Sequence, residues 1–473
     1  MPCSALQLDA RQITAAIKDC RVCGDLARIL QKQKLVLNYI HVSAAWVCVA
    51  KIGGGRGGSD LLEVVPSLQD RTRDVLKEMG GREVANALHS MAKLHKRGVT
   101  ADPGLVVAMK SRATATAGQF IPQNVANLLW ALATMGESAG RGLLAAMQRR
   151  AIATAGQFLP QNIANLSWAL AKMGVRADPE LLEAMQKRAT ATAGEFKPQE
   201  VANLLWALAT MGETAARGLL EAMQRRSTET AGEFKPQEVA NVLWALATMG
   251  ERADRGLLQA MQRRATATAG EFSPQEVANV LWALATVGEG AGHGLLEAMQ
   301  RRATATAGDF NPQNVANVLW ALAAVGGGAD GSLLVLMERL ADRVLELRHQ
   351  FMQAEKSQVH QWLLSCDLEL VSGASLHSGV ARVKQEMGTE CLQAFSGQAT
   401  SESRLQRDVA AALMSAGLKV EIEEEFRDAR SGYSIDVLVR RRSAAGSAEW
   451  AVEVDGPFHF LGDGRTPSGS TLV

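Results

Sequence analysis

The stretch Pro122-Gln-Asn-Val-Ala-Asn-Leu-Leu-Trp-Ala-Leu-Ala-Thr-Met-Gly136 decides the fold, because it returns almost verbatim along the chain. Consecutive copies are 38 residues apart, with a proline at position 1 and a tryptophan at position 9. A period of this length is typical of stacked-repeat architectures. The prolines are Pro122, Pro160, Pro198, Pro236, Pro274 and Pro312, and the tryptophans are Trp130, Trp168, Trp206, Trp244, Trp282 and Trp320.

Each copy predicts a pair of helices. In one copy Ser273 is a good N-cap, Glu276 completes a capping box, and Pro274 occupies the first helical position, where its missing N–H costs nothing. Gly136 ends the first helix of its copy. A second helix is expected from about residue 143 to residue 155, again followed by a glycine. The sequence therefore predicts a mostly α fold, a right-handed α-solenoid of helix pairs.

Composition narrows the class of protein further. The chain has 473 residues, too many for one compact core, and a formal net charge of +1. No overall basic field therefore attracts nucleic acid or membranes. Cys20 and Cys23 form one CxxC pair without a second pair, which does not favour zinc, so no metal is expected. No apolar run reaches the length of a membrane span, and the N-terminal residues mix acids with bases, unlike a clear transit peptide.

The repeats and the changes of composition between them predict four regions. Two helices are expected between residues 10 and 52, and another between 61 and 79. The Ser- and Gly-containing stretch before the last region is expected to be a linker. The regions are a degenerate helical part at 1–80, a solenoid at 81–365 with regular copies at 122–311, the linker at 366–400 and a second domain at 401–473.

The first helix of each copy is apolar on most sides. On a helical wheel Gln123, Asn127 and Thr134 form a narrow polar strip, with Asn124 nearby. Such strips would line up along one surface of a stack of helix pairs. The tryptophans would either fill the core between repeats or stack on nucleic-acid bases. The repeated asparagines would either bond base edges or bridge adjacent repeats.

Several sets of residues are candidates for contacts with single-stranded RNA. Positions 3 and 13 vary between copies, as in a reader of one base per repeat, although drift on a solvated face gives the same variation. The second arginine of each second helix has no partner in its own helix, so it is a candidate for a phosphate contact. The candidates are Asn124, Asn127, Arg150, Asn162, Asn165, Lys172, Arg188, Glu200, Asn203, Arg226, Glu238, Asn241, Arg264, Glu276, Asn279, Arg302, Asn314 and Asn317.

The repeat unit over residues 82–326 resembles the octatricopeptide repeat of organelle RNA-binding proteins. The C-terminal stretch, with Gly432-Tyr-Ser-Ile-Asp-Val437 and Ala451-Val-Glu-Val-Asp-Gly-Pro-Phe-His-Phe-Leu461, resembles the RAP domain of FAST-kinase-like proteins. That resemblance implies a small α/β fold similar to restriction endonucleases, which would be cut short after Gly469-Ser-Thr471. It also implies RNA binding and RNA processing, stability or expression of transcripts in the mitochondrion or chloroplast, alongside other organelle RNA-processing proteins.

Two other functions stay open from the sequence. The RAP resemblance places Asp436, Glu453 and Asp455 where they would hold Mg²⁺ in a metal-dependent RNA endonuclease, with His459 as an acid or base. Such nucleases usually carry a lysine where this chain has Asp455. In the alternative interpretation the chain keeps a nuclease-like fold in which these acids are structural. Without the nuclease no cofactor is expected. The third hypothesis is a protein-binding scaffold with no RNA role.

Overall fold

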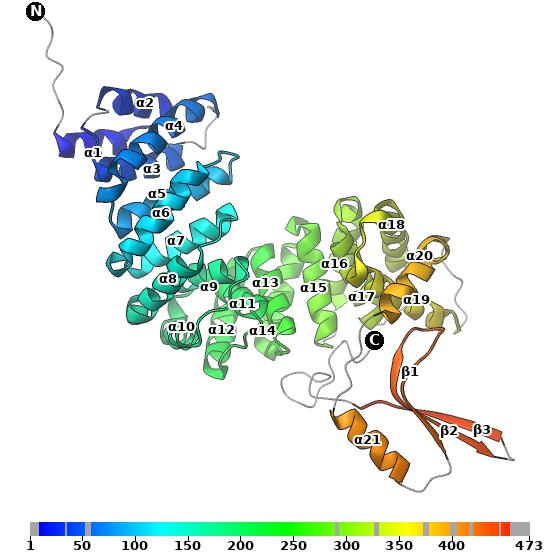
Figure 1. Cartoon of the computed structure of the whole chain (residues 1–473). Helices are drawn as coiled ribbons and strands as arrows, with labels where there is room; N and C mark the ends of the chain where they lie inside the picture. The colour runs from blue at the N-terminus through cyan, green and yellow to red at the C-terminus, as the bar shows by residue number, and fades with distance from the viewer. Residues whose placement is uncertain are drawn as a thin grey trace, which may run out of the picture. The chain divides into compact units, whose positions relative to one another are not determined.

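The computed structural model describes residues 9–33, 36–52, 58–288, 293–325, 331–371, 378–397, 404–415, 420–443 and 446–454. The chain divides into two compact units, Met1–Arg226 and Ser227–Val473. Within each unit the described helices form successive pairs, whose first member we call the A helix and whose second member we call the B helix (Figure 1).

The first unit is built of helix pairs throughout. Its A helices are α1 (Ala10–Asp19), α3 (Tyr39–Ile52), α5 (Gly81–His95), α7 (Pro122–Met135), α9 (Pro160–Lys172) and α11 (Pro198–Thr210). Its B helices are α2 (Cys23–Lys32), α4 (Gly58–Val75), α6 (Pro103–Ala115), α8 (Arg141–Ala153), α10 (Pro179–Ala191) and α12 (Arg217–Glu229). The boundary between the two units falls inside α12.

The second unit continues the pattern and then changes character. Its A helices are α13 (Pro236–Thr248), α15 (Pro274–Thr286), α17 (Pro312–Val325) and α19 (Gln353–Val371). Its B helices are α14 (Arg255–Ala267), α16 (His293–Thr306), α18 (Gly331–Leu347) and α20 (Ser378–Ser396). Helix α21 (Arg404–Ser415) and three strands follow. The predicted fold class, an α-solenoid of helix pairs followed by a small sheet-containing part, is confirmed.

The core lies between the two helices of each pair and between neighbouring pairs. A helices pack closely against A helices of adjacent repeats, and B helices contact B helices less extensively. The phenylalanine two residues before each proline is fully buried, as are most leucines and alanines of the A helices. Gly81 stands where other copies have proline, and a side chain there would approach the Phe120 ring to 2.5 Å. This burial of apolar surface supplies the main stabilisation of the stack.

One hydrogen bond recurs between the B helix and the start of the A helix in the same pair. The Nε of an arginine on the B helix donates to the backbone carbonyl two residues before the A helix, and we call this bond the arginine clamp. Arg150 donates to Phe120 at 2.6 Å in the α7–α8 pair. The equivalent bonds are Arg71–Leu37, Arg112–Met79, Arg188–Phe158, Arg226–Phe196, Arg264–Phe234, Arg302–Phe272 and Arg343–Phe310.

The second arginine of each regular B helix, expected to have no partner in its own helix, finds one in the clamp. That expectation considered the arginine's own helix, whereas the acceptor lies 30 residues earlier, at the start of the paired helix. The carbonyl precedes the helix and has no partner inside it, so the charged donor satisfies a group that would otherwise be left unbonded. A role for these arginines in binding phosphate stays a prediction.

Two expectations about boundaries are also corrected. The region 10–52 holds three helices rather than two, because the backbone leaves the helical conformation at Cys20 and resumes at Cys23. The stretch 366–400, expected to be a linker, contains the end of α19 and the whole of α20. Helix α20 packs on α18 and α19, and its buried residues Val380, Val383, Met387 and Cys391 have helical spacing.

The C-terminal strands form an antiparallel sheet in the order β1 (Glu421–Arg427), β2 (Ser434–Ser443), β3 (Gly446–Val452). Helix α21 packs on the sheet around a small core of Ala410, Val437 and Val439. The β1–β2 turn is bonded to the repeats, because a ring nitrogen of His360 on α19 lies 2.7 Å from the Ser431 carbonyl oxygen.

The clamp gives a direct test of what stabilises a repeat. We expect Arg150→Met to lower the free energy of unfolding by about 1.5–3 kcal/mol, since it leaves the Phe120 carbonyl without its charged donor. Arg149→Met is the matched control, because Arg149 is the exposed neighbour on the same helix and carries the same charge. Urea unfolding followed by circular dichroism measures both. Equal midpoints for the two variants would contradict the role of the clamp.

Candidate nucleic-acid interface

Positions 2, 6, 9 and 13 of each A helix form one line along the helix, which we call the aromatic stripe. Their spacing of 4, 3 and 4 residues keeps them on the same side. In α7 the stripe is Gln123, Asn127, Trp130 and Thr134, of which Gln123 is exposed and the other three are half-buried. The residues on either side of it are buried. Trp130 thus belongs to the partly exposed line of polar residues and not to the enclosed core.

The other copies repeat this placement. Trp168, Trp206, Trp244 and Trp282 are half-buried, whereas Trp320 is 6% exposed. In three pairs of neighbouring A helices the rings contact one another. In the first unit the centroids of His89 and Trp130 are 4.9 Å apart, and those of Trp130 and Trp168 are 6.4 Å apart. In the second unit Trp282 and Trp320 are 6.4 Å apart, tilted by 37°. The stripe therefore carries rows of touching aromatic rings, which are platforms on which bases stack.

The position-6 asparagines sit beside these rings. All are half-buried, and Asn317 accepts a hydrogen bond of 3.1 Å from Nε2 of Gln358 on the next A helix, so one of them does bridge repeats. In the described chain the side-chain amides of the others make no hydrogen bond to protein. Those others are Asn86, Asn127, Asn165, Asn203, Asn241 and Asn279. They therefore present donors and acceptors next to the aromatic platform.

Side chains at position 3, expected to contact bases, form hydrogen bonds with the backbone at the start of their own A helices. Glu200, Glu238 and Glu276 accept hydrogen bonds from the backbone N–H at the N-caps of their own helices, at 2.9, 2.9 and 2.7 Å. Asn162 does the same at 3.3 Å, and Asn124 and Asn314 are buried, at 4% and 5% exposed. Glu276 completes a capping box with Ser273, and Asn162, Glu200 and Glu238 make the bond from the position-3 side chain to the N-cap N–H. Their role in reading bases stays a prediction. The signal was in the sequence, because the Ser273–Glu276 capping box has equivalents in the other copies.

Position 13 varies in charge along the stripe. Lys93 and Lys172 are exposed at this position in the first unit. In the second unit the same position holds Thr248, Thr286 and Ala324. The described helices α13, α15 and α17 therefore have no cation at position 13. The candidate Lys172 therefore lies on the same stripe as Asn165 and Trp168, as expected.

His89 replaces tryptophan at position 9 of α5 and has an unusual environment. Burial, together with the positive charges of Lys93 and Lys96, lowers its pKa to about 4. Its Nδ1 is buried without a hydrogen-bond partner, as is the Thr134 hydroxyl on the neighbouring helix. The Nζ of Lys96 lies 4.8 Å from the centroid of the Trp130 ring. The contact between His89 and Trp130 joins two helices, so it has no local signal in the sequence.

The acids proposed for a nuclease are not assembled in the described part of the chain. Asp436 accepts hydrogen bonds from the Gln406 side chain and, at 2.7 Å, from the Val454 N–H, so its carboxylate ties α21 to the end of the sheet. Glu453 follows β3 and is exposed, while Asp455 and His459 lie outside the described residues. Among the residues the structure describes, no group of three potential metal ligands occurs. Their catalytic roles therefore stay untested predictions.

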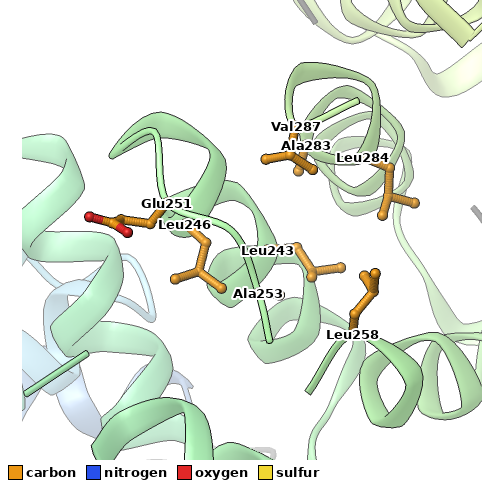
Figure 2. Close-up of a pocket in the computed structure, with 8 residues that line it drawn as sticks. All are labelled: Leu243, Leu246, Glu251, Ala253, Leu258, Ala283, Leu284 and Val287. Carbon is orange, nitrogen blue, oxygen red and sulfur yellow. The ribbon is translucent and has the colours of Figure 1, made fainter. Parts of the chain in front are cut away.

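A pocket in the second unit does not offer an alternative site. It lies between α13, the following loop, α14 and α15, and Leu243, Leu246, Leu258 and Leu284 form much of its wall (Figure 2). Its one charged lining residue is Glu251, whose carboxylate points away from the leucines in Figure 2. An apolar crevice without convergent polar groups is what packing between repeats leaves, and it suggests no ligand chemistry.

Stacked helix pairs with a half-exposed aromatic stripe define a helical-repeat protein of the α-solenoid class. A family model described as RNA-editing substrate-binding complex 6 protein matches residues 63–254, which contain the first-unit stripe from α5 onward. A second model, described as a protein of unknown function, matches residues 251–281 and 294–319. Comparison with curated proteins gives no match. Among solved structures, the crystal structure of an engineered protein is 12% identical, covering 78% of this chain and 98% of its own, with a TM-score of 0.19.

No helix in the described part of the chain combines the length and apolarity needed to cross a bilayer.

The buried histidine gives a test of the stripe's geometry. We expect His89 to titrate near pH 4, so it is neutral at pH 7. Because its folded pKa is below the ordinary value of 6.5, its contribution to stability is present above about pH 6.5 and is lost as the pH falls towards about 4. NMR of the ring protons measures the midpoint, and Lys96→Met should raise it. A midpoint near 6.5 in the unchanged protein would contradict the burial of this ring.

Proposed function

We propose that this chain is an RNA-binding protein that holds single-stranded RNA along the aromatic stripe. The observation that carries the proposal is the contact between rings of neighbouring A helices, His89–Trp130–Trp168 in the first unit and Trp282–Trp320 in the second, all of them half-buried except Trp320. A single strand exposes the faces of its bases, and every base has a face that stacks on an aromatic ring. Duplex RNA buries those faces in its own stack.

The polar neighbours of the rings support the same ligand. Position 6 presents an unbonded asparagine amide beside each first-unit ring, and position 2 presents an exposed glutamine in the regular copies. Amides donate and accept hydrogen bonds, so they match the edges of unpaired bases. A protein-binding stripe would be expected to bury large apolar side chains at its centre rather than alternate rings with amides. We therefore favour RNA over a protein partner as the ligand of this surface.

We further propose that the chain acts in the processing, stability or expression of organelle transcripts, together with other RNA-processing proteins. The match of residues 63–254 to the model described as RNA-editing substrate-binding complex 6 protein supports a role around RNA. The resemblance to octatricopeptide and RAP-domain proteins supports an organelle, the mitochondrion or the chloroplast. Asp436 is occupied in holding α21 to the sheet, so nothing in the described chain favours cleavage of the bound RNA.

The stripe is tested by removing one ring. We expect Trp168→Leu to weaken binding of single-stranded RNA about 5- to 100-fold, because stacking of one base on an aromatic side chain contributes about 1–3 kcal/mol. Fluorescence anisotropy with a labelled single-stranded pool, and with a duplex of the same length, measures the affinity.

The matched control is Trp450→Leu, since Trp450 is an exposed tryptophan on β3, away from the stripe, at 47% exposed. This control should bind like the unchanged protein. If the unchanged chain binds no single-stranded RNA even at low salt, the proposal fails and a protein-binding role takes its place. If both tryptophan variants weaken binding equally, the stripe is not the binding surface.

A further inference from the structure

The rings at position 9 of successive A helices form what we call the aromatic row. In the first unit, position 13 of the same stripe forms a second row beside it. The arginine clamp aligns the repeats, because Leu37 of the α3–α4 pair and Met79 of the α5–α6 pair accept the same bond as Phe120. In this alignment α11 has the uncharged Thr210 at position 13, and four other A helices of the first unit contribute the residues of the row. They are Lys51 on α3, Lys93 on α5, Thr134 on α7 and Lys172 on α9.

The lysines of this row are exposed and have no acidic partner. In the described chain neither Lys51, Lys93 nor Lys172 makes a hydrogen bond or an ion pair. Lys96, one turn beyond Lys93, contacts only the face of Trp130. These cations are close enough together that both Lys93 and Lys96 act on the pKa of His89.

Two carboxylates close to the row in the chain are engaged by other groups. Glu83 accepts the Gly80 N–H at 3.1 Å as part of a capping box. Glu137 forms an ion pair of 3.1 Å with Lys110 of the B helix α6. The positive charge along the row is therefore not neutralised within the first unit, even though the whole chain carries a net charge of only +1.

Thr134 supplies an independent observation. Its hydroxyl is buried and has no hydrogen-bond partner, although it lies between two lysine-bearing helices of the row. The equivalent Thr286 in the second unit donates its hydroxyl to the Trp282 carbonyl at 2.8 Å, which is how a threonine in a helix usually satisfies itself. A buried hydroxyl left unbonded costs free energy. Because Thr134 as a whole is half-buried, rotation of its side chain can turn the hydroxyl towards a ligand oxygen at the surface.

We propose that the row Lys51, Lys93, Thr134 and Lys172, with Lys96 beside it, binds the phosphates of the RNA strand whose bases lie on the aromatic row. The proposal rests on the proposed function for its ligand, and it deepens it by assigning the salt-dependent part of binding to the first unit. Ammonium groups act as point charges for phosphate oxygens, and the threonine hydroxyl adds a directional donor. The regular copies of the second unit lack such cations, so their stripe contributes stacking without phosphate contacts.

The experiment uses the full chain and two probes, a uridine 20-mer RNA and inorganic polyphosphate, which has phosphates but no bases. For single strands the logarithm of affinity falls with the logarithm of salt by about 0.7 for each phosphate contact. We expect the combined variant Lys93→Met, Lys96→Met, Lys172→Met to reduce the RNA slope by about 2 and to lose polyphosphate binding. Lys187→Met, an exposed lysine on the B helix α10, should leave both unchanged.

The outcomes separate this inference from the proposed function. RNA binding with an unchanged slope in the combined variant overturns the phosphate row and leaves the aromatic stripe. Polyphosphate binding that depends on these lysines, without RNA binding, supports the row and overturns the proposed function. Binding of neither probe overturns both.

Thr134→Val gives a second readout that does not depend on charge. We expect it to weaken RNA binding about tenfold, because it removes a donor to a charged oxygen. The fold should tolerate it, since the hydroxyl has no partner in the free protein. Thr114→Val, on the B helix α6, where the hydroxyl donates to the Lys110 carbonyl at 3.0 Å, should leave RNA affinity unchanged. Equal affinities for Thr134→Val and the unchanged protein would remove Thr134 from the row.

Discussion

The arginine clamp is the constraint on which the repeats depend. Apolar burial between helices is strong but not directional, and by itself it would let the two helices of a pair slide or rotate. A charged donor aimed at one backbone carbonyl fixes the C-terminal half of the B helix against the start of the A helix. The same bond recurs from Arg71 to Arg343, including copies whose other motif residues have changed. It therefore fixes the rotation of each A helix, and with it the direction in which the stripe faces.

Much of the fold follows from the sequence because local signals agree. The proline at position 1, the capping glycine and the period define the regular pairs, and the structure places α7 at Pro122–Met135 with Gly136 as its left-handed cap. The worn copies were harder, because their helices keep only an apolar spacing. The serines and glycines around helix α20 predict a linker, although Val380, Val383 and Met387 have helical spacing. Packing against α18 and α19 decides such a segment, and packing partners are not a local property.

The site was less predictable for a related reason. A helical wheel separates buried from exposed sides, but it cannot place a large ring that is half of each. From the sequence, Trp130 either fills the core or stacks on a base. Its spacing from Asn127 and Thr134 places it on the same line as these polar residues. Position 3 varies between copies and the clamp arginine recurs, and both patterns suggest ligand contacts. In the structure Glu200 accepts a hydrogen bond from the N–H of Lys197, and Arg188 donates one to the carbonyl of Phe158. Backbone groups at helix ends lack partners within the helix, so they form hydrogen bonds with nearby polar side chains. Polar side chains farther from the helix start stay available to a ligand.

These backbone hydrogen bonds at the helix starts explain where the two rows lie on each A helix. The backbone at the start of each A helix takes the side chains at position 3 and the clamp arginines, so the middle and the end of the helix are left for a ligand. In the middle lie rings and amides, which suit unpaired bases whatever their charge. At the end lie Lys93 and Lys172, with the unbonded Thr134 between their helices, which suit an anion. A strand that runs across the A helices from α5 to α9 would meet both rows, with its bases on one and its phosphates on the other. A chain with almost no net charge can therefore still bind a polyanion, because the few lysines without partners lie beside the rings.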